Sequence, residues 1–192
     1  MNETLKIISP VDGSVYAELP LADDKAVLTT LMAARAAQRK WREVPVAERV
    51  KIGAAFTDAM VADKARVSKE LAWQMGRPIR YGPGEMRGFE ERARYMLSIA
   101  AETLADIDVG PKAGFTRFIR REPLGVVLNL PAWNFPYMTA LNAVLPALLA
   151  GNTVVMKHSS QTALVAEHFA DCFARANLPK DVFQVLHMSH EA

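Results

Sequence analysis

The sequence predicts an α/β fold, in which an N-terminal hairpin and several helices precede a truncated doubly wound, Rossmann-like β-α-β-α-β unit. The first observation is that apolar runs at 125–130 and 153–156 flank an apolar segment of helical length, 136–150. Neighbouring runs that are apolar on both faces are typical of parallel strands covered by helices. The second observation is that an amphipathic helical pattern, 161–177, and a third apolar run, 182–186, follow.

The chain begins with a predicted β-hairpin. Strand-like runs at 5–8 and 14–19 are joined by a segment that contains proline and an Asp-Gly pair, which are typical turn residues. From residue 22 apolar residues repeat at helical spacing up to residue 41. Asp23 or Asp24 is the expected N-cap of this helix.

Further helices are predicted before the α/β unit. Helical patterns extend over 46–75 and stop at a Gly-Arg-Pro sequence at 76–78, which supplies a C-cap and a breaker. We expect a loop at 81–84 and a long amphipathic helix at 85–107. The charged residues of these helices are expected to face solvent.

A linker at 108–114 leads to a segment, 115–121, that alternates apolar and polar residues like a half-exposed strand. The segment contains Arg117, Arg120 and Arg121. These arginines either bind an anion or protect an edge strand from aggregation, and we favour the second interpretation.

Composition argues against several kinds of partner. The chain has 23 basic and 21 acidic residues and no basic tract, so we expect no nucleic acid and no anionic membrane as a partner. The longest apolar stretch is too short to span a bilayer, and the N-terminus does not resemble a targeting segment. The only cysteine, Cys172, lies on an apolar helical stripe and is interpreted as a core thiol. A cytoplasmic protein is therefore expected.

No metal site is expected. His187 and His190 are three residues apart at the end of the sequence, and we expect no carboxylate or thiol close to them that would complete a metal shell. His158 and His168 are interpreted as surface or packing residues.

The turn after the first parallel strand carries the candidate chemistry. It lacks the G-x-G-x-x-G fingerprint, and prolines at 131 and 136 bracket Asn134 at the sheet edge where open α/β folds bind ligands. The Asn134 amide either donates to an oxyanion, worth about 3 to 4 kcal/mol, or caps the next helix, which spacing alone favours. Lys157, after the second strand, can donate to a ribose hydroxyl or a phosphate, and Ser160 adds a neutral donor.

Three ordered segments resemble the aldehyde dehydrogenase superfamily, namely EPLGVV at 122–127, PAWNFP at 131–136 and ALLAGNTVVMK at 147–157. The likeness covers the whole chain. It implies the N-terminal part of that family's NAD(P)-binding domain, with Asn134 as the oxyanion-hole amide and Lys157 on the adenosine ribose of NAD or NADP. The residues that the resemblance places along the cofactor groove are Leu130, Pro131, Ala132 and Trp133.

The implied reaction is the oxidation of a small-molecule aldehyde to a carboxylic acid. A cysteine thiolate attacks the carbonyl, Asn134 stabilises the oxyanion, hydride passes to the nicotinamide, and a glutamate-activated water releases the acid. The family's cysteine and glutamate lie beyond the region that matches Ala192, and Cys172 matches neither. We therefore expect an oxidoreductase whose full-length form is active and of which this chain is an inactive fragment. The alternative is a non-catalytic nucleotide-binding or interaction module with the same fold.

Two departures from the family pattern bear on the cofactor. Ala132 replaces a proline that many relatives carry in the turn. Ser160 replaces a glutamate that NAD-preferring members commonly place on the ribose hydroxyls. Because a missing carboxylate relieves repulsion of a 2′-phosphate, we expect NADP to be tolerated or preferred.

The resemblance also divides the chain into three parts. Residues 1–105 form the hairpin and helical part of the cofactor-binding domain, 106–121 a bridging ribbon that joins subunits, and 122–192 the incomplete Rossmann-like unit. A homodimer or homotetramer is expected for the full-length form.

Overall fold

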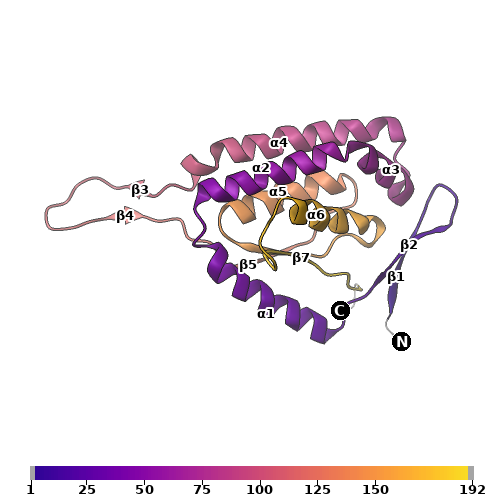
Figure 1. Ribbon diagram of the computed structural model, residues 1–192, viewed down its shortest axis with the longest axis horizontal. Helices are drawn as coiled ribbons and strands as arrows, with labels where there is room; N and C mark the ends of the chain where they lie inside the picture. The colour runs from indigo at the N-terminus through magenta and orange to yellow at the C-terminus, as the bar shows by residue number, and fades with distance from the viewer. Residues whose placement is uncertain (1–2, 190–192) are drawn as a thin grey trace.

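The computed structural model describes residues 3–189. The elements follow the predicted order along the chain (Figure 1). The strands are β1 (Thr4–Ile8), β2 (Val15–Pro20), β3 (Ile107–Asp108), β4 (Phe118–Ile119), β5 (Val126–Asn129), β6 (Thr153–Met156) and β7 (Phe183–Val185). The helices are α1 (Asp24–Trp41), α2 (Val46–Ala62), α3 (Lys64–Met75), η1 (Ile79–Tyr81), α4 (Gly82–Thr103), α5 (Pro136–Leu149), η2 (Ser160–Thr162) and α6 (Leu164–Arg175).

The predicted β-α-β-α-β unit is confirmed. β5, β6 and β7 form a parallel sheet in the order β5-β6-β7, with Val126 opposite Thr153 and Val154 opposite Phe183. Every residue of the central strand β6 is buried. α1 covers one face of the sheet, while α5 and α6 lie on the other, with α2 and α4 beyond them (Figure 1).

The main core lies on the α5 and α6 side of the sheet, where aromatic rings from α2, α4 and α6 meet. Phe56 stacks on Phe173 with ring centroids 3.8 Å apart, and Phe89 and Phe169 pack around them. Trp41, at the end of α1, is also buried, and its indole Nε1 donates to the carbonyl oxygen of Leu148, 3.0 Å away. These contacts fix α1 and α2 against the sheet, because aromatic side chains bury large apolar areas.

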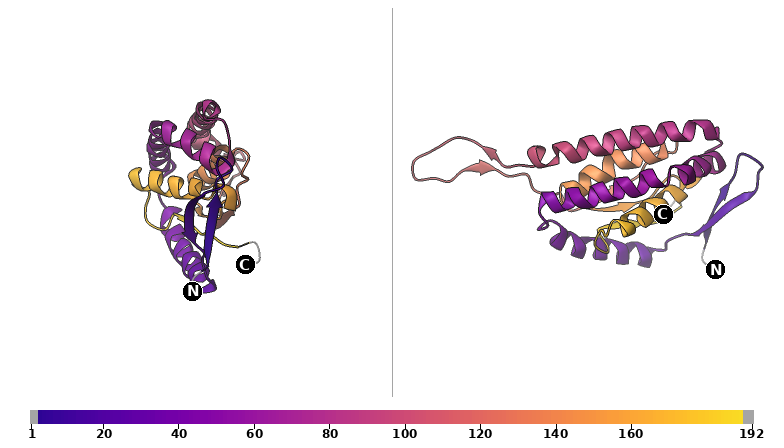
Figure 2. Two further views of the ribbon diagram at one scale, coloured as in Figure 1. Left: turned by 90° about the vertical axis from the view of Figure 1, so that its right-hand side faces the viewer. Right: turned by 45° about the horizontal axis from the view of Figure 1, so that its top comes forward.

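The segment between α4 and β5 forms a two-stranded antiparallel ribbon that projects from the body (Figures 1 and 2). The prediction of a linker followed by one strand over 115–121 is wrong, since the only strand within it is Phe118–Ile119, which pairs with Ile107–Asp108, and Phe115 forms a single bridge with Lys112. Gly110 and Gly114 adopt φ values of 81° and 79° in the connecting loop. Left-handed conformations of this kind favour glycine, so these residues support the turn that brings the two arms together.

The start and end of α4 also differ from the prediction. The expected loop at 81–84 is wrong, because residues 82–84 form the first helical turn, where a proline needs no backbone donor. The helix ends at Thr103 and not at residue 107, because Ile107 pairs in the ribbon. Over the part of the chain that the structure describes, no helix is both long enough and apolar enough to cross a membrane.

Candidate active site

The turn between β5 and α5 lies at the carboxyl edge of the parallel sheet. α5 begins at Pro136, its N-cap is Phe135, and no side chain caps it. The helix-capping interpretation of Asn134, which spacing favoured, is therefore wrong. Asn134 is exposed at this edge, where its amide is open to a ligand.

Side chains from distant elements hold the main chain of this turn. Arg77, which follows α3, donates through Nη2 to the carbonyl oxygen of Asn134 at 2.5 Å, and its guanidinium lies 4.5 Å from the centroid of the Phe135 ring. The same guanidinium forms an ion pair with Glu85 of α4. Glu85 in turn accepts a hydrogen bond from the backbone nitrogen of Tyr137 at 2.9 Å. The backbone on both sides of Pro136 is thus fixed by one buried ion pair.

Glu85 contradicts the expectation that the helix charges face solvent, since it is only 3% exposed. Burial raises the pKa of its carboxyl group above the usual value, while Arg77 and the backbone N–H groups of Tyr137 and Met138 act in the opposite direction. Sequence reasoning missed both Arg77 and Glu85. The available signal was weak, because it consisted of an arginine in the Gly-Arg-Pro breaker and an acid in the first turn of a helix.

A largely apolar cavity of about 480 Å³ lies next to this turn. Phe135 and Met138 line it from the α5 side, and Met75, Pro78 and Tyr81 from the opposite side. Arg77 and Glu85 supply its charged groups. An apolar cavity with few polar groups, next to an exposed amide, is a typical small-molecule site.

Lys157 lies at the same edge as the turn. Its backbone nitrogen donates to the carbonyl oxygen of Asn129 at 3.0 Å, so it extends the β5–β6 pairing by one residue, and its side chain is half-buried. Ser160 begins η2 and is also half-buried. The four groove residues connect the strand to Asn134: Leu130, Ala132 and Trp133 are exposed and Pro131 is buried.

Asn129 was not identified from the sequence. It ends β5, is 7% exposed, and its Oδ1 has no hydrogen-bond partner within residues 3–189. A buried amide oxygen without a donor is uncommon in folded proteins. The carboxyl end of β5 therefore offers a hydrogen-bond acceptor that has no partner among the described residues.

His158 connects the segment after β6 to the start of α5. It is 2% exposed, with Nε2 3.3 Å from the carbonyl oxygen of Pro136 and Nδ1 3.2 Å from the hydroxyl of Thr162. Burial lowers its pKa from 6.5 to about 4. The neutral ring can donate from Nε2 and accept at Nδ1, which confirms its interpretation as a packing residue.

Cys172 is confirmed as a core thiol, because it is fully buried and burial raises its pKa to about 11. Its sulfur, a carboxylate oxygen of Asp63 and a ring nitrogen of His168 lie within 4.8 Å of one another. Arg175 donates to Asp63 at 2.5 Å and to the Cys172 sulfur at 2.9 Å. The guanidinium thus supplies the positive charge that a metal ion would bring, and we interpret the group as a structural link between α2 and α6.

His187 has a partner that is distant in sequence. Its Nε2 lies 2.7 Å from a carboxylate oxygen of Glu167 on α6. The prediction that no carboxylate lies close to His187 is therefore wrong. One carboxylate does not, however, complete a metal shell. His190 lies outside the described residues.

Comparison with known proteins identifies the family of the chain. The model of the aldehyde dehydrogenase family matches residues 1–192. The chain belongs to the aldehyde dehydrogenase family. It is 30% identical over 187 residues to malonate-semialdehyde dehydrogenase 2 of Geobacillus thermodenitrificans, a match that covers 95% of this chain and 38% of the relative. It is also 30% identical over 185 residues to the NADP(+) D-glyceraldehyde dehydrogenase of Picrophilus torridus, covering 96% and 38%.

Solved structures of the family have the same fold over this region. PnpE in complex with nicotinamide adenine dinucleotide superimposes with a TM-score of 0.92 at 28% identity, covering 99% of this chain and 39% of PnpE. The NADP-dependent glyceraldehyde-3-phosphate dehydrogenase of Bacillus halodurans C-125, complexed with NADP, gives 0.90 at 26% identity, covering 99% and 41%. The chain thus spans about two fifths of the length of these aldehyde dehydrogenase relatives.

Proposed function

We propose that this chain forms the first part of the cofactor-binding domain of an NAD(P)-dependent aldehyde dehydrogenase, whose full-length form oxidises an aldehyde to a carboxylic acid. The observation that carries the proposal is the edge formed by β5 and β6. There Asn134 is exposed and uninvolved in capping, its carbonyl oxygen is held by Arg77, and Lys157 follows the adjacent strand. An amide held in this way needs little reorganisation when it donates to an oxyanion.

The residues at this edge fit a dinucleotide. Leu130 and Trp133 are 64% and 49% exposed, so they offer apolar surface to a nicotinamide ribose or ring. Lys157 offers a cation to the adenosine ribose or to a phosphate on it, and Ser160 offers a hydroxyl and no carboxylate. Bound NAD(P) supplies the hydride acceptor. Because no acidic side chain stands at Ser160, we propose that NADP is bound at least as well as NAD.

The chain by itself is proposed to bind cofactor without turnover. Its one cysteine, Cys172, is buried and its pKa is about 11, so it offers no thiolate at neutral pH. The second candidate function is a non-catalytic nucleotide-binding or interaction module with the same fold. Both candidates are cytoplasmic proteins in our proposal.

The projecting ribbon is proposed to join subunits of the full-length enzyme into a homodimer or homotetramer. It exposes large apolar side chains outside the body of the molecule, where they have little packing of their own. Exposed apolar surface of this kind is typical of contact regions. These side chains are Ile107, Val109, Phe115, Phe118 and Ile119.

Titration of the purified chain with NADP and NAD, followed by calorimetry, tests the cofactor assignment. Lys157→Met should weaken NADP binding roughly tenfold, as expected when a charged hydrogen-bond donor is lost. Lys180→Met, at an exposed lysine after α6, is the matched control and should leave the affinity unchanged. Equal affinities for Lys157→Met and the unmodified chain would contradict the assignment.

Kinetics of the full-length enzyme separate the two candidate functions. Asn134→Ala should lower kcat by about 10² to 10³, the usual effect of losing one oxyanion donor, with cofactor affinity unchanged. A full-length protein that binds NADP but turns over no aldehyde would instead support the non-catalytic module.

A further inference from the structure

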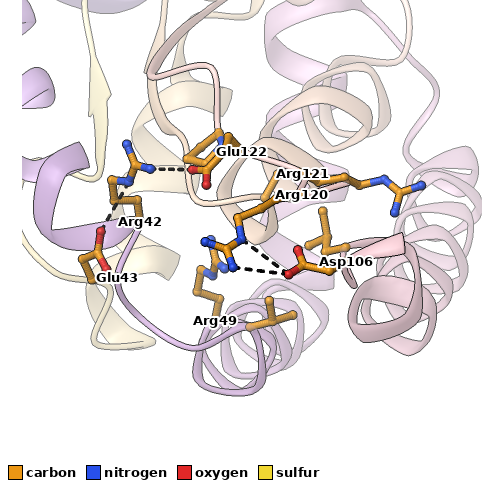
Figure 3. A pocket seen from close by; sticks show the side chains of 11 residues that line it. Arg42, Glu43, Arg49, Asp106, Arg120, Arg121 and Glu122 are labelled. Atoms are coloured by element: carbon orange, nitrogen blue, oxygen red, sulfur yellow. Dashed lines mark hydrogen bonds and ion pairs between the residues drawn. The ribbon is translucent and has the colours of Figure 1, made fainter. Parts of the chain in front are cut away.

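A second pocket lies at the base of the ribbon, away from the β5–α5 turn. It has a volume of about 300 Å³ and is lined by the start of α2, the end of α4 and the segment that joins β4 to β5 (Figure 3). Four arginines and three carboxylates line it, which leaves one net positive charge. The lining arginines are Arg42, Arg49, Arg120 and Arg121.

The three carboxylates are already committed. Glu43 and Glu122 both pair with Arg42, and Asp106 pairs with Arg120 at 3.4 Å. The Arg121 guanidinium points away from the pocket centre and donates to the carbonyl oxygen of Ala105 (Figure 3). Within the part of the chain that the structure describes, Arg49 is therefore the one lining arginine with neither a carboxylate nor a carbonyl partner.

Arg49 is a buried charged residue in α2, a helix whose other charged residues are exposed. It is 8% exposed, and its Nε and Nη1 have no hydrogen-bond partner within the described residues. Nη1 lies against Gly151, where a Cβ atom would approach it to 2.2 Å, so the glycine makes room for the guanidinium. Burial lowers the pKa of Arg49, which reflects how poorly its charge is solvated. A buried guanidinium without an acceptor is costly. Because Nε and Nη1 are closed to solvent, an anion in the pocket would reach this guanidinium at Nη2.

We propose that this pocket is a carboxylate-binding site, in which Arg49 and Arg120 bind the anion from opposite walls. The two side chains extend toward one another from α2 and from the end of β4 (Figure 3). Guanidinium groups match the planar geometry of a carboxylate, and an anion would supply the acceptor that Arg49 lacks. A dianion such as phosphate would meet repulsion from Glu43, Asp106 and Glu122, so a monoanion fits better. The carboxylate comes either from a free small molecule or from a side chain of another polypeptide.

Titration of the purified chain with sodium acetate, at ionic strength held constant with sodium chloride, tests the site. Arginine Nε–H resonances report on it directly by NMR, and those of Arg49 and Arg120 should shift with one common saturation curve. Arg120→Gln should weaken binding by roughly tenfold, the effect of losing one charged hydrogen-bond donor. Because Arg120 is half-exposed, this variant should fold. Arg117→Gln, at a ribbon arginine that does not line the pocket, should change the affinity less than about twofold.

The source of the carboxylate is distinguished by sedimentation of the same proteins. Acetate binding to a chain that stays monomeric indicates a free small molecule. A self-associated chain that acetate dissociates, and that Arg120→Gln renders monomeric, indicates a protein carboxylate. The proposal is overturned if acetate shifts neither resonance and leaves any association unchanged, or if Arg120→Gln and Arg117→Gln respond alike. Cofactor binding at Lys157 is a separate measurement, so either result can fail without the other.

Discussion

Lowering the pH from about 7 to about 5 is expected to reduce the free energy of unfolding by about 2 kcal/mol through His158 alone. The folded-state pKa of His158 is about 4, against 6.5 for the free side chain, because the ring is buried. The unfolded chain therefore binds a proton that the folded chain rejects between these values. The stability contributed by the neutral ring is present above pH 6.5 and is lost as the pH falls toward about 4. The complete loss would be about 3 kcal/mol, at about 1.4 kcal/mol per pH unit.

Urea unfolding at a series of pH values measures this loss. His158→Gln retains an N–H donor for the carbonyl oxygen of Pro136 but cannot titrate, so its stability should be lower at neutral pH and less dependent on pH. Burial also lowers the pKa of His168, so the unmodified chain has additional pH dependence that both proteins share. The difference between the two proteins isolates His158. Identical pH slopes would refute the reasoning, since they would mean that His158 is solvated in the folded state.

Three further predictions concern stability and reactivity. Arg77→Met should destabilise the fold by about 3 kcal/mol or more in thermal or urea unfolding, because it leaves Glu85 buried without its cation; a change below about 1 kcal/mol would contradict this. Trp41→Phe should cost about 1 kcal/mol in the same assay, because the Leu148 carbonyl loses the indole donor but keeps the backbone N–H of Gly151, and unchanged stability would mean that water replaces the indole. Cys172 should react with iodoacetamide in the folded chain far more slowly than in urea, as mass spectrometry can follow, because its thiol is buried and its pKa is about 11; equal rates would show that the core around it opens readily.

Elements defined by local patterns could be predicted from the sequence. The order of the parallel strands and helices follows from apolar periodicity, and the position of Asn134 at a sheet edge follows from the prolines around it. The ribbon was only partly predicted, because its pairing depends on glycines that turn the chain far from any apolar repeat. Family resemblance then supplied roles that no spacing could assign.

Buried charges could not be predicted. Glu85 and Arg49 lie in helices whose charged residues otherwise face solvent, and nothing in their neighbourhoods separates them from those residues. Their burial depends on chain segments that pack across them, such as Tyr137 against Glu85 and Gly151 against Arg49. A pattern read along one helix contains no information about what covers it.

The structure of the β5–α5 turn depends both on its local sequence and on contacts from distant segments of the chain. Within four residues, the carbonyl oxygens of Asn134 and Pro136 and the backbone nitrogen of Tyr137 are bound by side chains of Arg77, His158 and Glu85. Those side chains come from three separate parts of the chain, so the position of the Asn134 amide depends on the tertiary structure and not on the turn sequence alone. Because catalysis by a fixed dipole requires positioning before the reaction, changes at these three residues should lower kcat in the full-length enzyme more than they weaken cofactor binding at Lys157. A parallel loss of both would mean that the sheet edge moves as one unit and that these contacts do not position Asn134 specifically.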